Sequence, residues 1–157
     1  MTTALTILLT LNLATYVWVC CKVFGTPETL SDTYYLGAGE WFTGVMSVEA
    51  MGLTTAVIAD GRGLLPLALM GVAGLLVVAF VPTFRHCDRC HWAHNAGAWL
   101  AAIGCVGWSV SVSVWPTLLV AAAYALYTMT VGRYQWLAAE LATFGCAFLT
   151  LLATPLG

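Results

Sequence analysis

Long apolar stretches with few interruptions are the feature of this chain that most constrains its fold. Hydrophobic residues make up 61% of the 157 residues, and charged residues only 8%. A soluble domain carries about 25% charged residues, so this chain lacks the polar groups to cover a globular surface. Backbone polar groups in a bilayer must be paired internally, which leaves helices or a closed barrel. Because the apolar runs do not alternate with polar residues, we predict an all-α integral membrane protein.

Six segments approach the length of about 20 apolar residues that a membrane-spanning helix needs. We predict one transmembrane domain, residues 1–157, with helices at about 4–24, 41–59, 63–82, 92–112, 116–131 and 134–154. Turn residues mark the breaks, for example at 25–27 and 60–63. The fifth segment is short, so a bundle of five spans would also fit. The predicted architecture is a compact bundle of about six transmembrane helices.

The basic residues divide unequally between the two sides of such a bundle. With six spans, four of the five basic residues fall on one side, and only Arg62 falls on the other. Loops rich in Lys and Arg stay in the cytoplasm. We therefore predict that both termini lie outside and that the loops at 25–40 and 83–91 are cytoplasmic. The net charge of −2 argues against nucleic acid as a partner, because phosphate binding needs a basic surface.

All three histidines lie close together in the sequence, beside two cysteines. This His–Cys cluster consists of His86, Cys87, Cys90, His91 and His94. Thiolates and imidazoles are the ligands that Zn²⁺ prefers, so a zinc site at His86, Cys87, Cys90 and His91 is one interpretation. A redox-active C-x-x-C pair beside two arginines is a second interpretation. The third is a polar loop with incidental thiols.

Residues 87–91 also match C-x-x-C-H, the attachment pattern of haem c. Haem c is normally attached outside the cytoplasm, whereas the distribution of basic residues places this loop inside. The chain also has little soluble part to surround a porphyrin. We therefore do not favour haem c as a cofactor.

Two carboxylates lie inside predicted spans, where a charge is costly and usually faces the interior of the bundle. Glu49 and Glu140 each lie roughly 10–12 Å from the same predicted boundary, given a rise of 1.5 Å per residue. Other polar residues approach from that side: Asp32, Glu40, His94 and Asn95. We predict a polar pocket in one leaflet. The alternative is that each carboxylate is protonated or hydrogen-bonded locally.

Three short motifs resemble those of a known membrane family. They are Ser-Asp-Thr at 31–33, Glu-Trp at 40–41 and His-Asn-Ala-Gly-Ala at 94–98. They resemble the damage-regulated autophagy modulators and their Frag-type relatives, which act in lipid remodelling and autophagy without an agreed chemistry. The resemblance implies a six-helix bundle, with matching positions at Ser31, Asp32, Glu40 and His94. The chain departs from the family pattern in having Tyr34 after Ser-Asp-Thr and in its added C-x-x-C loop.

Three functional hypotheses follow. The first is a non-enzymatic protein that binds or passes a lipid, small solute or proton through the polar pocket. The second is a membrane-embedded enzyme, dependent on zinc or on the C-x-x-C thiols, acting on a lipid-soluble substrate. The third is an accessory subunit that forms a homo-oligomer or binds a membrane partner, because small residues recur at every fourth position from Ala93 to Cys105. We favour the first, with membrane lipids as partners.

Overall fold

The computed structural model describes residues 2–81 and 88–153, and most of them are helical. The described chain forms six α-helices and one short 3-10 helix, η1, and it contains no strand. The elements are α1 (Thr2–Phe24), η1 (Ser31–Tyr34), α2 (Gly39–Asp60), α3 (Leu65–Phe80), α4 (Asp88–Val112), α5 (Val114–Thr130) and α6 (Gln135–Ala153). The predicted all-α bundle of six helices is therefore confirmed.

Four of the described helices are long and apolar enough to cross a membrane: α1, α2, α4 and α6. The other two, α3 and α5, are apolar but have only 16 and 17 residues. Helices of this length extend roughly 24–26 Å. That is slightly less than the hydrocarbon thickness of about 30 Å.

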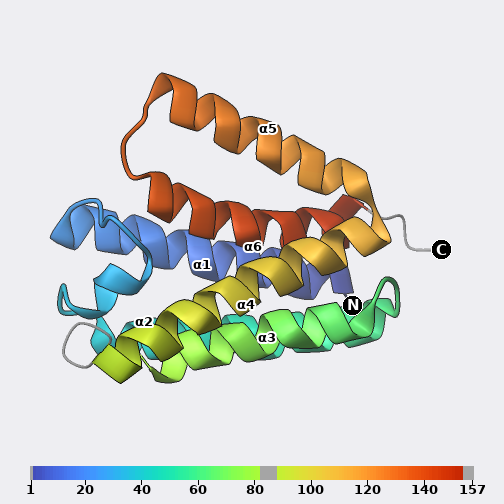
Figure 1. Cartoon of the computed structure of the whole chain (residues 1–157), viewed down its shortest axis with the longest axis horizontal. Coiled ribbons are helices and arrows are strands. Elements are labelled where there is room, and N and C mark those ends of the chain that lie inside the picture. Colours follow the sequence, from blue (N-terminus) through green and yellow to red (C-terminus); the bar gives the residue numbers. More distant parts are fainter. Residues whose placement is uncertain (1, 82–87, 154–157) are drawn as a thin grey trace.

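Successive helices run in opposite directions along the long axis of the molecule (Figure 1). The first loop (residues 25–38) carries η1 and lies at one end, which we call the η1 end. The starts of α2, α4 and α6 lie at this end, whereas the start of α1 and the end of α6 lie at the opposite end.

The closest packing in the bundle joins α3 to α4, whose ribbons lie against each other in Figure 1. Glycines on both helices make this approach possible. A Cβ atom added to Gly104 would lie 2.2 Å from the backbone nitrogen of Gly71, and one added to Gly74 would lie 2.3 Å from that of Ala101. Small residues therefore bring the two backbones into direct contact, as at membrane helix interfaces generally.

Helix α5 packs loosely by comparison. Pro116 is its only buried residue. Its contacts are with α4 and α6, and its ribbon diverges from α6 toward the η1 end (Figure 1). The chain turns into α5 at Ser113, whose extended backbone (φ −160°) ends α4.

The helix bounds agree with the sequence prediction to within two residues, except at the start of α4. α4 begins at Asp88 rather than at 92, so Cys90 and His91 lie on its first turn. An acidic residue in the first turn stabilises a helix through the helix dipole, which accounts for the earlier start. α5 begins at 114 rather than 116, because Pro116 is tolerated in a first turn, where no backbone donor is needed. α3 is shorter than the predicted 63–82.

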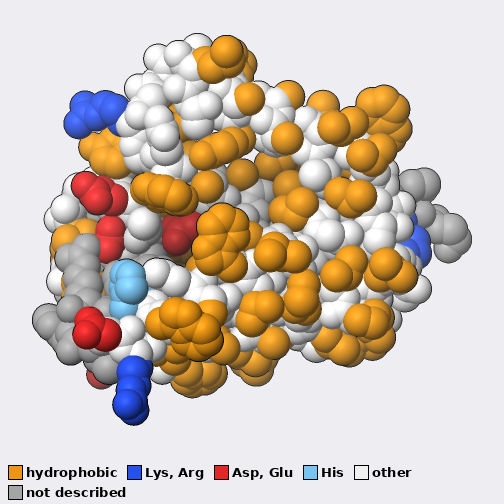
Figure 2. All heavy atoms as spheres, in the orientation of Figure 1, with side chains coloured by type: hydrophobic (Ala, Val, Ile, Leu, Met, Phe, Trp, Pro, Cys, Tyr) orange, Lys and Arg blue, Asp and Glu red, His pale blue; other side chains and the backbone are white. Residues whose placement is uncertain are grey.

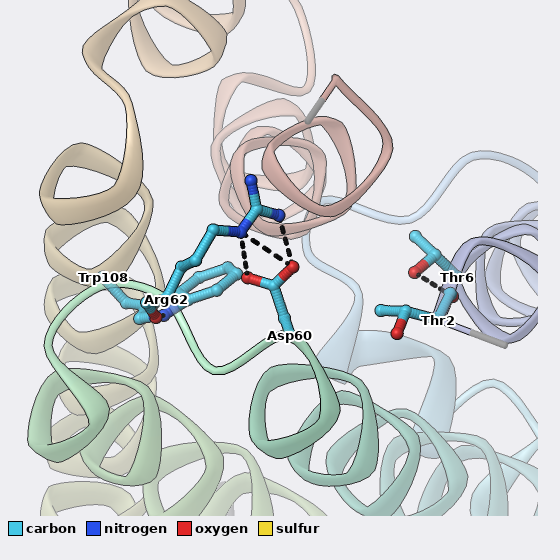
Figure 3. A network of polar contacts seen from close by, with 5 residues as sticks. All are labelled: Thr2, Thr6, Asp60, Arg62 and Trp108. Atoms are coloured by element: carbon cyan, nitrogen blue, oxygen red, sulfur yellow. Dashed lines mark hydrogen bonds and ion pairs between the residues drawn. The ribbon is translucent and has the colours of Figure 1, made fainter. Parts of the chain in front are cut away.

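The turn between α2 and α3 lies at the end opposite η1 and is held by polar contacts (Figure 3). The Arg62 guanidinium pairs with Asp60, with its Nε 3.0 Å from Oδ2. The Arg62 carbonyl accepts a hydrogen bond from the Trp108 indole at 3.0 Å. Figure 3 also shows the start of α1, where the Thr6 hydroxyl donates to the Thr2 carbonyl at 2.9 Å. The charges at this turn therefore neutralise each other.

Most other charged side chains gather at the η1 end. On the face shown in Figure 2, most acidic and basic side chains and the histidine lie at that end, while hydrophobic side chains are spread over the rest and a basic side chain shows at the opposite edge. The described basic residues at the η1 end are Lys22, Arg89 and Arg133. Among the described residues, one end of the bundle is thus strongly polar, and the other carries the neutralised Asp60–Arg62 pair.

Candidate functional site

The first loop crosses the η1 end and is tied to the helices by hydrogen bonds. The Leu30 amide donates to Glu140 Oε2 on α6 at 2.5 Å. The Leu137 amide at the start of α6 donates to the Glu28 carbonyl at 2.9 Å. On α1, the Tyr16 hydroxyl lies 2.5 Å from the Thr33 hydroxyl. These bonds fix the loop against α1 and α6.

His94 fixes the same loop to α4 and is itself buried, with 4% of its surface exposed. Its Nδ1 lies 2.9 Å from the Val81 carbonyl, and its Nε2 lies 2.9 Å from Ser31 Oγ. A carbonyl can only accept, so Nδ1 carries a hydrogen. In a neutral ring Nε2 then accepts from the Ser31 hydroxyl. His94 thus joins the end of α3, the start of α4 and η1.

A cavity of ≈ 450 Å³ lies between the first loop and helices α2, α3, α4 and α6. Its polar lining residues, apart from tryptophan, are Thr29, Ser31, Asn95, Glu140 and Thr143. Its apolar lining includes Phe42, Met46, Leu75, Ala102 and Phe144. The volume lies within the range of about 300–1,000 Å³ typical of small-molecule sites. The cavity is polar near the η1 end and apolar deeper in the bundle.

The cavity opens sideways, between α4 and α6. Trp99 and Trp136 line it and are 65% and 69% exposed. Figure 2 shows an acidic side chain inside a hollow on this face, between hydrophobic side chains, and Glu140 is the acidic residue of the cavity lining. The helices that flank this opening, α4 and α6, are both long and apolar enough to cross a membrane.

Exposed tryptophans indicate how deep the cavity lies. Four of them are near the helix ends at the η1 end: Trp18, Trp41, Trp92 and Trp136. Such residues are enriched where membrane meets water. Glu140 is four residues beyond Trp136, or roughly 6 Å deeper. Ala102 is ten residues beyond Trp92, or roughly 15 Å deeper, which is about half of the hydrocarbon thickness.

Glu49 lies elsewhere, between α1 and α2, and does not line this cavity. It is fully buried, at 0% exposure. Its Oε1 accepts a hydrogen bond from Asn12 Nδ2 at 2.8 Å, and its Oε2 has no partner among the described residues. Glu40 is exposed and lines a second, open cavity of ≈ 320 Å³ together with Asn12 and Trp41.

The predicted pocket residues therefore form two groups. One surrounds the first loop: Ser31, Asp32, His94, Asn95 and Glu140. Within it, Asp32 Oδ2 accepts from the Thr29 amide at 3.2 Å. The other group is Glu49 and Glu40 on α2. Similar depth along the helices thus does not bring Glu49 and Glu140 into one cavity.

The His–Cys cluster is described only in part. His86 and Cys87 lie outside the described residues, whereas Cys90 and His91 lie on α4. His91 Nε2 lies 3.0 Å from Asn95 Nδ2. Within residues 2–81 and 88–153, no group of three or more His, Cys, Asp or Glu side chains could hold a metal ion. The zinc and redox interpretations stay predictions.

Sequence reasoning missed several parts of the cavity. Thr29, Trp99 and Trp136 line it without belonging to any motif. The position of Trp136, one residue into the last helix, is a signal that could have been used, since tryptophan favours the membrane interface. The Leu30 amide and the Val81 carbonyl have no sequence signal, because every residue has such groups.

Comparison with known proteins identifies no relative: no family model, no curated protein and no solved structure matches this chain. The resemblance to the autophagy-modulator family therefore stays a prediction. Function is argued below from the geometry of the site.

We expect His94→Ala to lower the free energy of unfolding by about 2 kcal/mol, because it removes the partner of two largely buried polar groups. Those groups are the Ser31 hydroxyl and the Val81 carbonyl. The measurement is reversible unfolding of the purified protein in detergent. His91→Ala is the control, since His91 is exposed and its loss should cost less than about 0.5 kcal/mol. Equal losses for both variants would contradict the anchoring role of His94.

Proposed function

We propose that this protein is a non-enzymatic integral membrane protein that binds a lipid-like amphiphile, which enters sideways from one leaflet. The observation that carries the proposal is the cavity between α4 and α6, with polar groups near the η1 end and apolar walls deeper in. An amphiphile in a leaflet likewise has its polar headgroup at the membrane surface and its apolar chain deeper in the bilayer.

The position of the cavity supports this proposal. Its depth, reckoned from the exposed tryptophans, matches the half-thickness of a bilayer. Its opening between Trp99 and Trp136 would admit a molecule from the lipid phase without passage through water. The amphipathic indole rings suit the boundary between headgroups and acyl chains.

Binding is favoured over passage across the membrane by the packing beyond the cavity. Further along α4, Trp108 is 1% exposed, and its indole is hydrogen-bonded to the α2–α3 turn. Ser109 is also buried, and it hydrogen-bonds to Thr150 and to the Cys146 carbonyl on α6. Beyond the cavity, Trp108 therefore fills the interior toward the α2–α3 turn and Ser109 fills it toward α6, where a continuous pathway would have to run.

The orientation is part of the proposal. Among the described basic residues, Lys22, Arg89 and Arg133 belong to the η1 end, and Arg62 is paired with Asp60 at the other end. The excess of basic residues supports a cytoplasmic η1 end. The binding cavity would then open to the cytoplasmic leaflet, with both chain termini on the opposite side.

Photolabelling tests the proposal. The purified protein in phosphatidylcholine nanodiscs is exposed to a twelve-carbon alcohol with a diazirine in its chain, and labelled peptides are identified by mass spectrometry. We expect saturable labelling of α4 and α6 segments that line the cavity. Ala102→Phe fills the apolar part and should reduce that labelling at least tenfold.

Ala122→Phe is the matched control, because Ala122 lies on the exposed surface of α5 and outside the cavity lining. It should label like the wild type. Non-saturable labelling spread over all lipid-facing helices, or unchanged labelling in Ala102→Phe, would refute an amphiphile site in this cavity.

A further inference from the structure

The polar wall of the cavity presents mainly hydrogen-bond acceptors. Glu140 receives one hydrogen bond among the described residues, from the Leu30 amide to Oε2, so Oε1 remains able to accept another. Asn95 uses Nδ2 in its contact with His91, which leaves its Oδ1 as an acceptor. Of the lining hydroxyls, Ser31 and Thr143 donate within the protein, to His94 Nε2 and to the Ala139 carbonyl, whereas Thr29 accepts from the Asp32 amide at 3.1 Å and keeps its O–H. A ligand headgroup that donates hydrogen bonds would complement this wall.

The charge of the polar wall also favours a headgroup that donates hydrogen bonds. No Lys or Arg is among the described residues that line the cavity, whereas Glu140 is. Asp32 lies near enough to Glu140 to interact with it electrostatically, which adds a second acidic group. An anionic headgroup would therefore meet the Glu140 carboxyl group, with Asp32 close behind it, and no Lys or Arg among the described lining residues. A cationic headgroup would supply the partner that a carboxylate in a low-dielectric site requires.

We propose, on the basis of the function proposed above, that the occupant is a single-chain amphiphile with a protonated amino headgroup that pairs with Glu140. An ammonium group has three N–H donors and can bond to Glu140 Oε1 and Asn95 Oδ1 together. Hydrogen bonds between charged groups are also stronger than neutral ones. A cavity of ≈ 450 Å³ suits one hydrocarbon chain better than two.

The test compares three diazirine probes with the same twelve-carbon chain in the wild-type protein in nanodiscs. One is a primary amine, one an alcohol and one a carboxylic acid, each dosed by its mole fraction in the bilayer. We expect half-maximal labelling of the cavity peptides at an amine concentration about tenfold to hundredfold below that of the alcohol, from the strength of a charged hydrogen bond. The acid should give no saturable labelling.

Glu140→Gln removes the charge but keeps an oxygen that can accept from the Leu30 amide. In this variant the amine should lose its advantage and label like the alcohol. Glu40→Gln is the matched control, since Glu40 is an acidic residue at the same end of the bundle and lies outside this cavity lining. It should keep the full preference for the amine.

The outcomes distinguish failure of the proposed amino headgroup from failure of the proposed binding cavity. If amine and alcohol label the cavity equally in the wild type and Ala102→Phe abolishes both, the amino headgroup is refuted and the proposed function stands. If no probe labels the cavity saturably, both proposals fail. If Glu40→Gln loses the amine preference as fully as Glu140→Gln, the preference reflects surface charge, and the pairing with Glu140 is refuted. The wild-type comparison does not depend on the folding of any variant.

Discussion

Gly104→Ala is expected to lower the free energy of unfolding by about 3 kcal/mol or more, at the upper end of the range for overpacked cores. The added Cβ would lie 2.2 Å from the Gly71 nitrogen and 2.5 Å from the Gly71 Cα. Both atoms belong to the backbone of α3, so no side-chain rotation can relieve the overlap. The two helices must separate, although their contact is the most extensive in the bundle.

Gly44→Ala is the matched control for this substitution. Gly44 lies inside α2, and a Cβ atom there would meet nothing within 4 Å. Because alanine favours a helix by about 1 kcal/mol over glycine, this variant should be as stable as the wild type or more stable. Unfolding of both variants in detergent, followed by tryptophan fluorescence, measures the difference. Equal stability of Gly104→Ala and the wild type would contradict the close backbone contact.

The sequence predicts one of the two helix faces that form this contact. Small residues at every fourth position predict that one face of the fourth span approaches another helix, and the structure buries Gly97, Ala101 and Cys105 of that series. The sequence does not predict that the partner helix is α3. Gly71 and Gly74 lie in a uniformly apolar segment, where no polar residue marks which face turns inward.

The sequence predicts how deep each candidate site residue lies in the bundle, but not in which direction its side chain points. Counting residues from a helix end gives the depth of Glu49 and Glu140, because the rise per residue is constant. The direction of each side chain depends on which helices are neighbours. Glu140 faces the first loop, whereas Glu49 faces α1 through Asn12. A prediction from depth alone therefore placed the residues of two separate polar sites in one pocket.

Asn12→Leu is expected to lower the free energy of unfolding by about 3 kcal/mol, the upper end of the cost of leaving a buried polar group without its hydrogen-bond partner. Glu49 is fully buried, and Asn12 Nδ2, 2.8 Å from Oε1, is its only hydrogen-bond donor among the described residues. Its Oε2 already lacks a partner in the part of the chain that the structure describes. Without Asn12, both oxygens of the carboxyl group would be buried without a donor.

Replacing both members of the pair should recover most of that loss. Asn12→Leu combined with Glu49→Leu removes both polar members of the pair, and apolar replacement of both hydrogen-bond partners can be nearly neutral or stabilising. A double-mutant cycle should therefore give a coupling energy of about 2 kcal/mol or more, at the upper end of the range for residues in contact. Amphiphile labelling should be unchanged in the double variant, because neither residue lines the cavity between α4 and α6. A double variant as unstable as Asn12→Leu would mean that the two residues do not act as a pair, and lost labelling would assign Glu49 to the binding site after all.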